Sequence, residues 1–245
     1  MLLLYCRSRI QLHGGAGVVI EPGKNCILFF VKYPEKGRVK KRLSKSIGEG
    51  VAAELYRNFV LDSLSALEKC GVQFVVSFHP PDAQKKIIEW LGKDYSYMPQ
   101  QGDDLGQRMR NGFINMFDKN CQRVIIIGSD SPDLPGEFID EAFSSLKTHD
   151  VVIGPSFDGG YYLIGFRHDT FFPETFDGIC WSTDTVFSET STIVKKAGLT
   201  LHVLPGWNDI DTRNDLDGLI ERNRNTAFRR SMTFSYLSTL DEISM

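Results

Sequence analysis

A loop rich in cations follows the first segment that has the composition of a β-strand. Lys32 ends an apolar run, and the next residues pass through Pro34 and Gly37 before reaching Leu43. The cations of this loop are Lys32, Lys36, Arg38, Lys40, Lys41 and Arg42. Clustered cations repel one another, and a bound diphosphate or triphosphate would relieve that repulsion. The loop therefore predicts phosphate binding, with a solvated basic surface loop as the alternative.

Carboxylates follow a second strand-like segment. The run from Val124 to Ile127 is continuously apolar, and Asp130 comes directly after it. Carboxylates at a strand end suit a hard cation such as Mg²⁺ or Mn²⁺, which bridges to phosphate oxygens. For Asp130 we favour metal binding over helix capping. For Asp133, which lies between two prolines, we favour a turn or a helix cap.

Three other segments carry weaker signals. Asp158 precedes two glycines, which form either a hairpin turn or a loop that lets the backbone approach a ligand. Asp209 and Asp211 precede a helix that begins with a Thr212–Asp215 capping pair, and acidic residues at a helix start have a purely structural explanation too. The segment from Gln101 to Met109 opens another helix, with Asp104 and Arg108 spaced as an i,i+4 pair.

Strand-like and helical segments alternate along the chain, which predicts a mostly parallel sheet with helices on both faces. The predicted strands are Cys26–Lys32, Val72–Phe78, Tyr95–Met98, Arg123–Gly128, Val151–Gly154, Tyr161–Phe166 and Leu199–Leu204. A helix is predicted at Thr183–Ala197, ending before Gly198, and a last helix follows Thr212. We expect one domain at 25–225, an N-terminal extension at 1–24 and a C-terminal tail at 226–245.

Composition excludes several classes of protein. The 245 residues carry a net charge of −3 and are 42% hydrophobic, which is typical of a globular enzyme. A slightly acidic chain offers no general attraction to nucleic acid, and no apolar run reaches the ~20 residues of a membrane span. Its five cysteines are scattered without zinc or redox spacing, so we expect reduced thiols in a cytoplasmic protein.

Taken in order, these motifs resemble the nucleotide-diphospho-sugar transferase superfamily, which has the GT-A fold. They are most similar to a group of small bacterial GT-A-like transferases. The matching segments are Phe30 to Leu43, Gln100 or Gln101 to Met109, Gly128 to Leu134, Gly154 to Gly165, Trp181 to Thr183 and Asp209 to Leu216. One departure is Lys41, which stands where the group usually has Thr. The resemblance implies a single-domain, Rossmann-like GT-A architecture.

The resemblance also implies roles for particular side chains. The phosphates of a nucleotide would be held by Lys32, Lys40 and Arg42. Asp130 would bind Mg²⁺ or Mn²⁺, with Asp211 as a second ligand, and Asp130 and Asp158 would be the catalytic carboxylates. Near the nucleotide we expect Gln101, Asp104 and Arg108, and near a small-molecule acceptor Asp158, Tyr161 and Trp181.

The reaction itself has three interpretations. No residue has the setting of a covalent nucleophile, so we expect direct displacement with cations stabilising the departing phosphate. We favour glycosyl transfer from a nucleotide-diphospho-sugar. The basic loop also resembles that of phospholactate guanylyltransferases, which favours nucleotidyl transfer with release of pyrophosphate. A non-catalytic nucleotide sensor is the third interpretation. Exposed loop cations add little to folding stability, so Lys40→Ala and Arg42→Ala are expected to weaken nucleotide binding without lowering the melting temperature.

Overall fold

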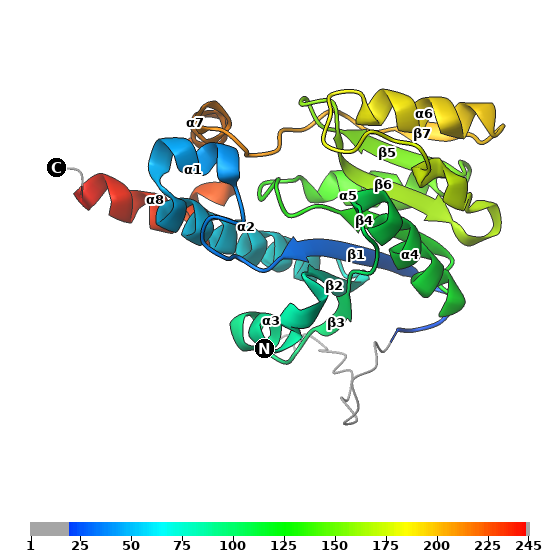
Figure 1. The fold of residues 1–245 in the computed structure, drawn as a ribbon, viewed down its shortest axis with the longest axis horizontal. Helices are drawn as coiled ribbons and strands as arrows, with labels where there is room; N and C mark the ends of the chain where they lie inside the picture. Colours follow the sequence, from blue (N-terminus) through cyan, green and yellow to red (C-terminus); the bar gives the residue numbers. More distant parts are fainter. Residues whose placement is uncertain (1–19, 244–245) are drawn as a thin grey trace, which may run out of the picture.

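The strand that leads into the basic loop lies inside a seven-stranded sheet (Figure 1). The computed structural model describes residues 20–243. The sheet order is β3-β2-β1-β4-β6-β5-β7, and β6 is antiparallel to both of its neighbours while the other pairs are parallel. The strands are β1 (Asn25–Lys32), β2 (Gln73–His79), β3 (Ser96–Pro99), β4 (Arg123–Ile127), β5 (Val151–Pro155), β6 (Tyr161–Arg167) and β7 (Leu201–Val203). All seven predicted strands are confirmed, with ends shifted by no more than two residues.

Helices cover both faces of the sheet because side chains alternate along each strand. On β1, Ile27 and Phe29 pack on one face, while Leu28 and Phe30 pack on the other. On the first face lie α1 (Lys41–Ile47), α2 (Glu49–Lys69), α3 (Gln84–Leu91), α5 (Gly136–Ser145) and α7 (Arg213–Arg222), and α8 (Met232–Ile243) packs outside them against α2. The second face is covered by α4 (Leu105–Asp118) and α6 (Val186–Lys196). The predicted mostly parallel α/β architecture is therefore confirmed. None of the helices in the described part of the chain is long and apolar enough to span a membrane.

Two helix ends follow the local sequence signals, and one does not. Thr212 and Asp215 form the predicted capping box at the start of α7. Gly198 takes a positive φ of 75° just after α6, as expected for a residue that ends a helix. The start of α6 was predicted three residues too early. Ser182 has a φ of 69° and the Thr183 hydroxyl donates to the Cys180 carbonyl at 2.7 Å, so this stretch is a turn.

The C-terminal segment differs from the predicted tail. Residues 226–243 form a short 3₁₀ helix, Ala227–Arg230, and then α8, which packs against α2. The carboxylate of Asp62 on α2 accepts hydrogen bonds from the backbone N–H groups of Met232 at 2.8 Å and Thr233 at 2.9 Å. Asp62 thus satisfies free donors at the start of α8 from a distant part of the chain. Of the predicted N-terminal extension, residues 1–19 lie outside the described residues.

Replacing Asp62 with Ala is expected to lower the free energy of unfolding by about 1–2 kcal/mol, since it leaves two helix-start donors without an acceptor. Asp62→Asn is the control, because its amide oxygen still accepts one of these bonds and retains part of the stability. Urea denaturation of both variants measures the difference. Equal stability of Asp62→Ala and the wild-type protein would contradict the capping role.

Candidate active site

The topology brings the basic loop and the acidic segments to one edge of the sheet. Strands β1 and β4 are parallel neighbours, so the segments that follow Lys32 and Ile127 leave from the same edge. The backbone N–H of Ile210 donates to the carbonyl of Asp130 at 2.9 Å, which fastens the segment containing Asp209 and Asp211 beside them. The carboxyl edge of such a sheet is where open α/β proteins bind ligands.

Lys40 is the centre of this arrangement. Its side chain is only 2% exposed, and its ammonium forms ion pairs with Asp130 and with Asp211, the latter at 3.1 Å. Burial alone would lower the pKa of Lys40, but the two carboxylates hold the pKa above its ordinary value. The prediction that the loop cations are exposed is therefore wrong for Lys40.

Arg42 lies above Lys40 at the surface, with its side chain 59% exposed. Its Nη2 donates to Oδ2 of Asp211 at 2.6 Å and lies 4.0 Å from Oδ2 of Asp158. Burial alone would raise the pKa of Asp211, but Lys40 and Arg42 hold the pKa below its ordinary value. Five of the predicted site residues are thus brought together: Lys40, Arg42, Asp130, Asp158 and Asp211.

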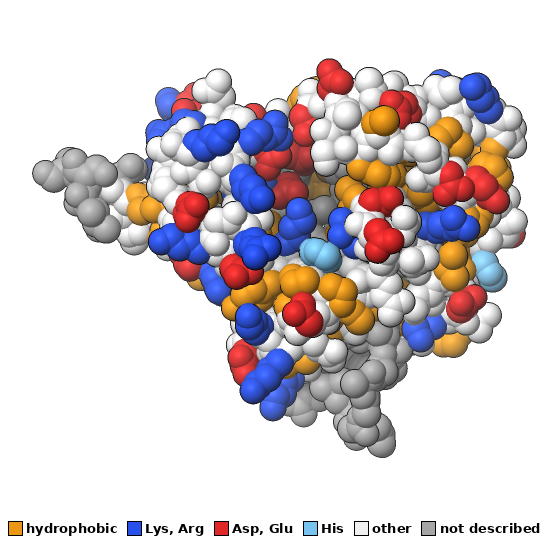
Figure 2. Space-filling model, viewed as in Figure 1, with side chains coloured by type: hydrophobic (Ala, Val, Ile, Leu, Met, Phe, Trp, Pro, Cys, Tyr) orange, Lys and Arg blue, Asp and Glu red, His pale blue; other side chains and the backbone are white. Residues whose placement is uncertain are grey.

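Asp209 joins this group, although no role was predicted for it from its sequence context. Its Oδ1 accepts a hydrogen bond from the Ser131 hydroxyl at 2.7 Å. Burial, together with the charge of Asp130, raises the pKa of Asp209 to about 7. Four carboxylates, those of Asp130, Asp158, Asp209 and Asp211, here face the two cations Lys40 and Arg42, so carboxylates outnumber cations in the group. Acidic and basic side chains meet around a hollow near the centre of the face in Figure 2.

The raised pKa of Asp209 predicts a pH-dependent stability. Between about pH 4 and pH 7 the folded protein keeps a proton on Asp209 that the unfolded chain releases, so this group makes stability fall as the pH rises. Asp209→Asn has no carboxyl to ionise, so its free energy of unfolding does not fall in this way. At pH 8 the variant is expected to be more stable than the wild-type protein by at least about 1.4 kcal/mol. At pH 4 the two proteins are expected to be equally stable.

Urea denaturation at both pH values measures this difference. Asp217→Asn is the control, because Asp217 is 52% exposed in a surface pair with Arg213 and has no such buried neighbours. A stability difference that is the same at pH 4 and pH 8 would contradict the raised pKa.

A buried hydroxyl pair supports the two strand ends behind the charges. Tyr56 on α2 accepts a hydrogen bond from the Lys32 N–H at 2.9 Å, and its hydroxyl lies 2.7 Å from that of Ser129. Burial and the charge of Asp130 raise the pKa of Tyr56 to about 12, so the hydroxyl stays protonated. Sequence reasoning missed Tyr56, because an aromatic residue on an apolar helix face is indistinguishable from a core residue.

A second polar region lies at the same edge of the sheet, at the ends of the parallel strands β1 and β2 and the start of α4. Burial, Arg108 and Lys32 together lower the pKa of His79. Within the described residues, Nε of Arg108 and Nδ1 of His79 are buried without a hydrogen-bond partner. A buried guanidinium nitrogen without a partner is costly, so this region favours an acceptor from a ligand. Sequence reasoning missed His79, which had no motif around it.

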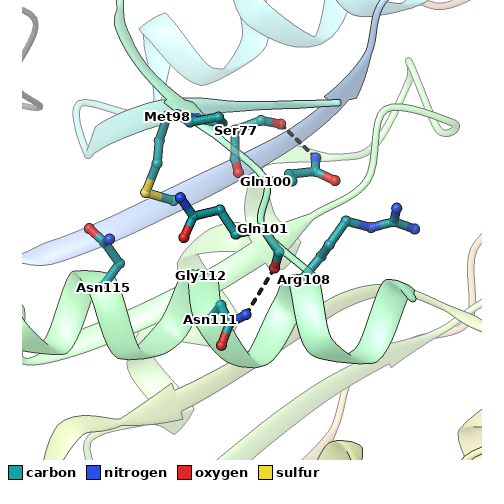
Figure 3. A pocket seen from close by; sticks show the side chains of 9 residues that line it. Ser77, Met98, Gln100, Gln101, Arg108, Asn111, Gly112 and Asn115 are labelled. Atoms are coloured by element: carbon teal, nitrogen blue, oxygen red, sulfur yellow. Dashed lines mark hydrogen bonds between the residues drawn. The ribbon is translucent and has the colours of Figure 1, made fainter. Parts of the chain in front are cut away.

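A pocket of about 100 Å³ adjoins this region (Figure 3). Gln101 extends into it, whereas the guanidinium end of Arg108 extends out of it. The Gln100 amide donates to the Ser77 carbonyl at 2.8 Å, and the Asn111 amide donates to the Gln101 carbonyl at 2.9 Å, which fixes the loop before α4. The lining residues are Ser77, Met98, Pro99, Gln100, Gln101, Arg108, Asn111, Gly112 and Asn115.

Three predicted site residues have structural contacts instead of a place in the charged group. Asp104 caps α4 by accepting the Gln107 N–H at 2.8 Å, and within the described residues it acts on Arg108 through its charge and not as an ion pair. The Tyr161 hydroxyl points toward Met109 on α4, 3.8 Å from its sulfur, in the packing between sheet and helices. The Trp181 ring lies against Gly106, where a Cβ would come within 2.4 Å of it.

Asp133 is structural, as predicted, but it does not cap a helix. Its side chain is 3% exposed and forms an ion pair with Arg222 of α7 at 2.6 Å. Asn223 donates to it at 2.6 Å and the Trp207 indole at 3.3 Å. Pro135, not Asp133, occupies the N-cap of α5. Asp133 therefore joins the Asp130 loop to α7.

The donor set fits a divalent metal ion only in part. Asp130 and Asp211 offer oxygen ligands of the kind that Mg²⁺ and Mn²⁺ prefer, and Mg²⁺ is often held by one or two carboxylates together with substrate phosphates. Within residues 20–243, no three His, Cys, Asp or Glu side chains are arranged to hold a metal ion. The chemistry of the pair therefore fits a metal ion that arrives with phosphate ligands.

Comparison with known proteins places the chain in a family. A family model described as an uncharacterized protein conserved in bacteria (DUF2064) matches residues 61–183, half of the chain. A structure from Desulfovibrio desulfuricans G20 is 44% identical over 90% of this chain and 96% of that one, with a TM-score of 0.86. The chain belongs to the DUF2064 family. The Desulfovibrio protein is described as a candidate nucleotide-diphospho-sugar transferase.

More distant structures share only the fold with this DUF2064 chain. The 4-diphosphocytidyl-2C-methyl-D-erythritol synthase of Anaerococcus prevotii DSM 20548 is 12% identical over 83% of this chain and 97% of its own, with a TM-score of 0.54. The inositol-1-phosphate CTP transferase of T. maritima is 16% identical over 84% and 98%, with a TM-score of 0.51. These likenesses confirm the predicted GT-A-like fold. No curated protein matches the chain in sequence.

Proposed function

We propose that this DUF2064 chain is a nucleotide-dependent transferase that uses a nucleotide-diphospho-sugar donor. The observation that carries the proposal is the meeting of loop cations with strand-end carboxylates, with Lys40 and Arg42 on one side and Asp130, Asp158 and Asp211 on the other. The 44% identical Desulfovibrio relative, described as a candidate transferase of this class, supports it. Transferase activity in general is the broader conclusion, and glycosyl transfer is the specific proposal.

In this proposal the donor diphosphate lies between the acidic group and the region of Lys32 and Arg108. Arg42 is exposed enough to reach a phosphate, and Arg108 has a buried nitrogen that needs an acceptor. These cations stabilise negative charge that develops on the departing nucleoside diphosphate. A bound Mg²⁺ or Mn²⁺, held by Asp130 and Asp211, would add Lewis-acid stabilisation to the same oxygens.

Asp158 is the proposed base for the acceptor. Its Oδ1 accepts hydrogen bonds from the Ser156 hydroxyl at 2.6 Å and the Gly160 N–H at 3.1 Å, which fix the carboxylate, while Oδ2 lies toward Arg42. In the transfer, an acceptor hydroxyl oxygen bonds to the anomeric carbon as the carbon–oxygen bond to the diphosphate breaks. The electron pair leaves with the nucleoside diphosphate, and Oδ2 of Asp158 takes the hydroxyl proton.

Nucleotidyl transfer is the second candidate, favoured by the basic loop from Lys32 to Arg42. In that reaction a phosphorylated acceptor attacks the α-phosphorus of a nucleoside triphosphate, and pyrophosphate leaves. The released product separates the two candidates. A panel of nucleotide sugars and small acceptors, with Mg²⁺ or Mn²⁺, is expected to release nucleoside diphosphate, whereas triphosphates with phosphorylated acceptors are expected to release no pyrophosphate.

Release of pyrophosphate alone would replace glycosyl transfer by nucleotidyl transfer. If both panels give no product while nucleotides raise the melting temperature, the protein is a nucleotide sensor and the transferase proposal fails. Asp158→Asn is the matched control for glycosyl transfer, because it keeps the hydrogen bonds to Oδ1 and removes the base for the acceptor hydroxyl.

Arg42→Ala is expected to weaken nucleoside diphosphate binding about 10- to 100-fold, the loss of one charge-assisted hydrogen bond of about 1.5–3 kcal/mol. Its melting temperature is expected to change little, because the side chain is 59% exposed. Arg38→Ala is the control from the same loop, since Arg38 is 76% exposed and pairs only weakly with Glu35 at 3.9 Å. Titration calorimetry that gives equal affinities for the two variants would contradict the role of Arg42.

A further inference from the structure

The ammonium group of Lys40 lies where two carboxylates meet. It pairs with Asp130, which is 47% exposed, and with Asp211, which is 31% exposed, while Lys40 itself is 2% exposed. The cation is thus buried beneath two carboxylates that are both more accessible to solvent than it is. Its position between two oxygen ligands is one that a bound metal ion would compete for.

The surroundings of Lys40 hold it in this place. Its backbone is left-handed, with a φ of 48° and a ψ of 45°, which is uncommon and strained for a residue with a side chain. Its Nζ lies 5.9 Å from the ring centre of Tyr56 and 5.7 Å from that of Phe59, so aromatic faces enclose the charge from below. The strained backbone and the enclosing aromatic rings therefore hold the ammonium group of Lys40 in one position.

The charge of Lys40 affects the binding of any metal ion to the same carboxylates. Asp130, Asp209 and Asp211 all act on Lys40, and removal of this cation would leave like charges close together. A divalent ion that bound Asp130 and Asp211 without other partners would leave the buried ammonium unpaired beside a like charge, which is costly. A phosphate group removes this cost, because it can accept from Lys40 while it also coordinates the metal ion.

We propose that Lys40 is the resident cation of the Asp130–Asp211 pair, so that a divalent metal ion binds there only together with a phosphate-bearing ligand. The inference rests on the proposed function for the identity of that ligand. By linkage, the metal ion raises the affinity for the ligand by the same factor as the ligand raises the affinity for the metal ion.

The test is a titration of the protein with Mn²⁺ in the absence of nucleotide, with free Mn²⁺ followed by electron paramagnetic resonance. The wild-type protein is expected to bind weakly, with a Kd of about 1 mM or above. Lys40→Met removes the competing charge and is expected to bind Mn²⁺ at least about tenfold more tightly. Lys41→Met, which alters an exposed neighbour, is the matched control and is expected to behave as the wild-type protein.

Lys40→Met combined with Asp211→Asn shows where the ion binds, because the tighter binding is expected to disappear. If Lys40→Met does not fold, the inference is tested on the wild-type protein with an added phosphate ligand. Tripolyphosphate serves as a probe for the phosphate-bearing ligand. The mixture of wild-type protein and tripolyphosphate is expected to bind Mn²⁺ at least about tenfold more tightly than tripolyphosphate does without the protein.

Tight Mn²⁺ binding by the wild-type protein alone, or unchanged binding by a folded Lys40→Met, would overturn the inference. Neither result touches the transferase proposal, since both are measured without substrate turnover. Conversely, a missing transfer activity leaves these titrations unaffected.

Discussion

Replacing Asp130 with Asn is expected to lower turnover by about 10²–10³-fold while the protein stays folded. Asp130 follows β4 at the carboxyl edge of the sheet, and its side chain is 47% exposed. Asn keeps the shape but removes the charge that would hold a metal ion beside the leaving phosphate. Folding survives because Lys40 keeps its ion pair with Asp211. Steady-state kinetics with the donor identified by the product panel measure the loss.

Asp133 provides the contrasting variant from the same loop. Its carboxylate is 3% exposed and pairs with Arg222, so Asp133→Asn is expected to lower stability rather than catalysis in the protein that remains folded. Nucleotide affinity measured with and without Mn²⁺ completes the comparison. Normal turnover and an equal enhancement by Mn²⁺ in Asp130→Asn and the wild-type protein would refute the role of Asp130.

Lys40→Met is expected to lower the free energy of unfolding by about 2–3 kcal/mol at pH 7, because Asp130 and Asp211 lose their shared cation. The loss stays below the ~3–5 kcal/mol of a fully buried pair, since water reaches both carboxylates. Arg42→Met, the control, is expected to lose less than about 1 kcal/mol, because Arg42 is 59% exposed. Urea denaturation at pH 7 measures both.

From the sequence alone, substitutions of Lys40 and Arg42 are both expected to leave folding stability unchanged. The structure instead predicts a large loss of stability for Lys40 and a small one for Arg42. Lys40 and Arg42 hold the pKa of Asp211 below its ordinary value, so the difference between the two variants is expected to shrink only when the pH falls below the ordinary range of an aspartate and Asp211 takes up a proton. If Lys40→Met is as stable as Arg42→Met at pH 7, the buried ion pair contributes nothing to folding and its role is confined to ligands.

Local sequence determined most of the fold. The continuously apolar run from Val124 to Ile127 predicts a strand covered on both faces, and β4 is such a strand. The Thr212–Asp215 pair predicts the start of α7, because a capping box needs only residues three apart. The segment that became α8 was missed, because its packing depends on α2 and its first N–H groups are satisfied by Asp62, 170 residues earlier in the chain.

For the candidate site, the sequence determined which side chains could meet but not how they share their charges. Parallel strands end at a common edge, so the placement of Lys40, Asp130 and Asp158 after strands was enough to predict a charged crevice. Only the tertiary structure decided that Lys40 is buried and Arg42 exposed, although they are two residues apart, Lys40 just before α1 and Arg42 in its first turn. The raised pKa of Asp209 and the ion pair between Asp133 and Arg222 also arise only in the tertiary structure. Burial and ion pairing depend on residues distant in sequence, such as Asp211, 171 positions from Lys40, and no local pattern encodes that distance.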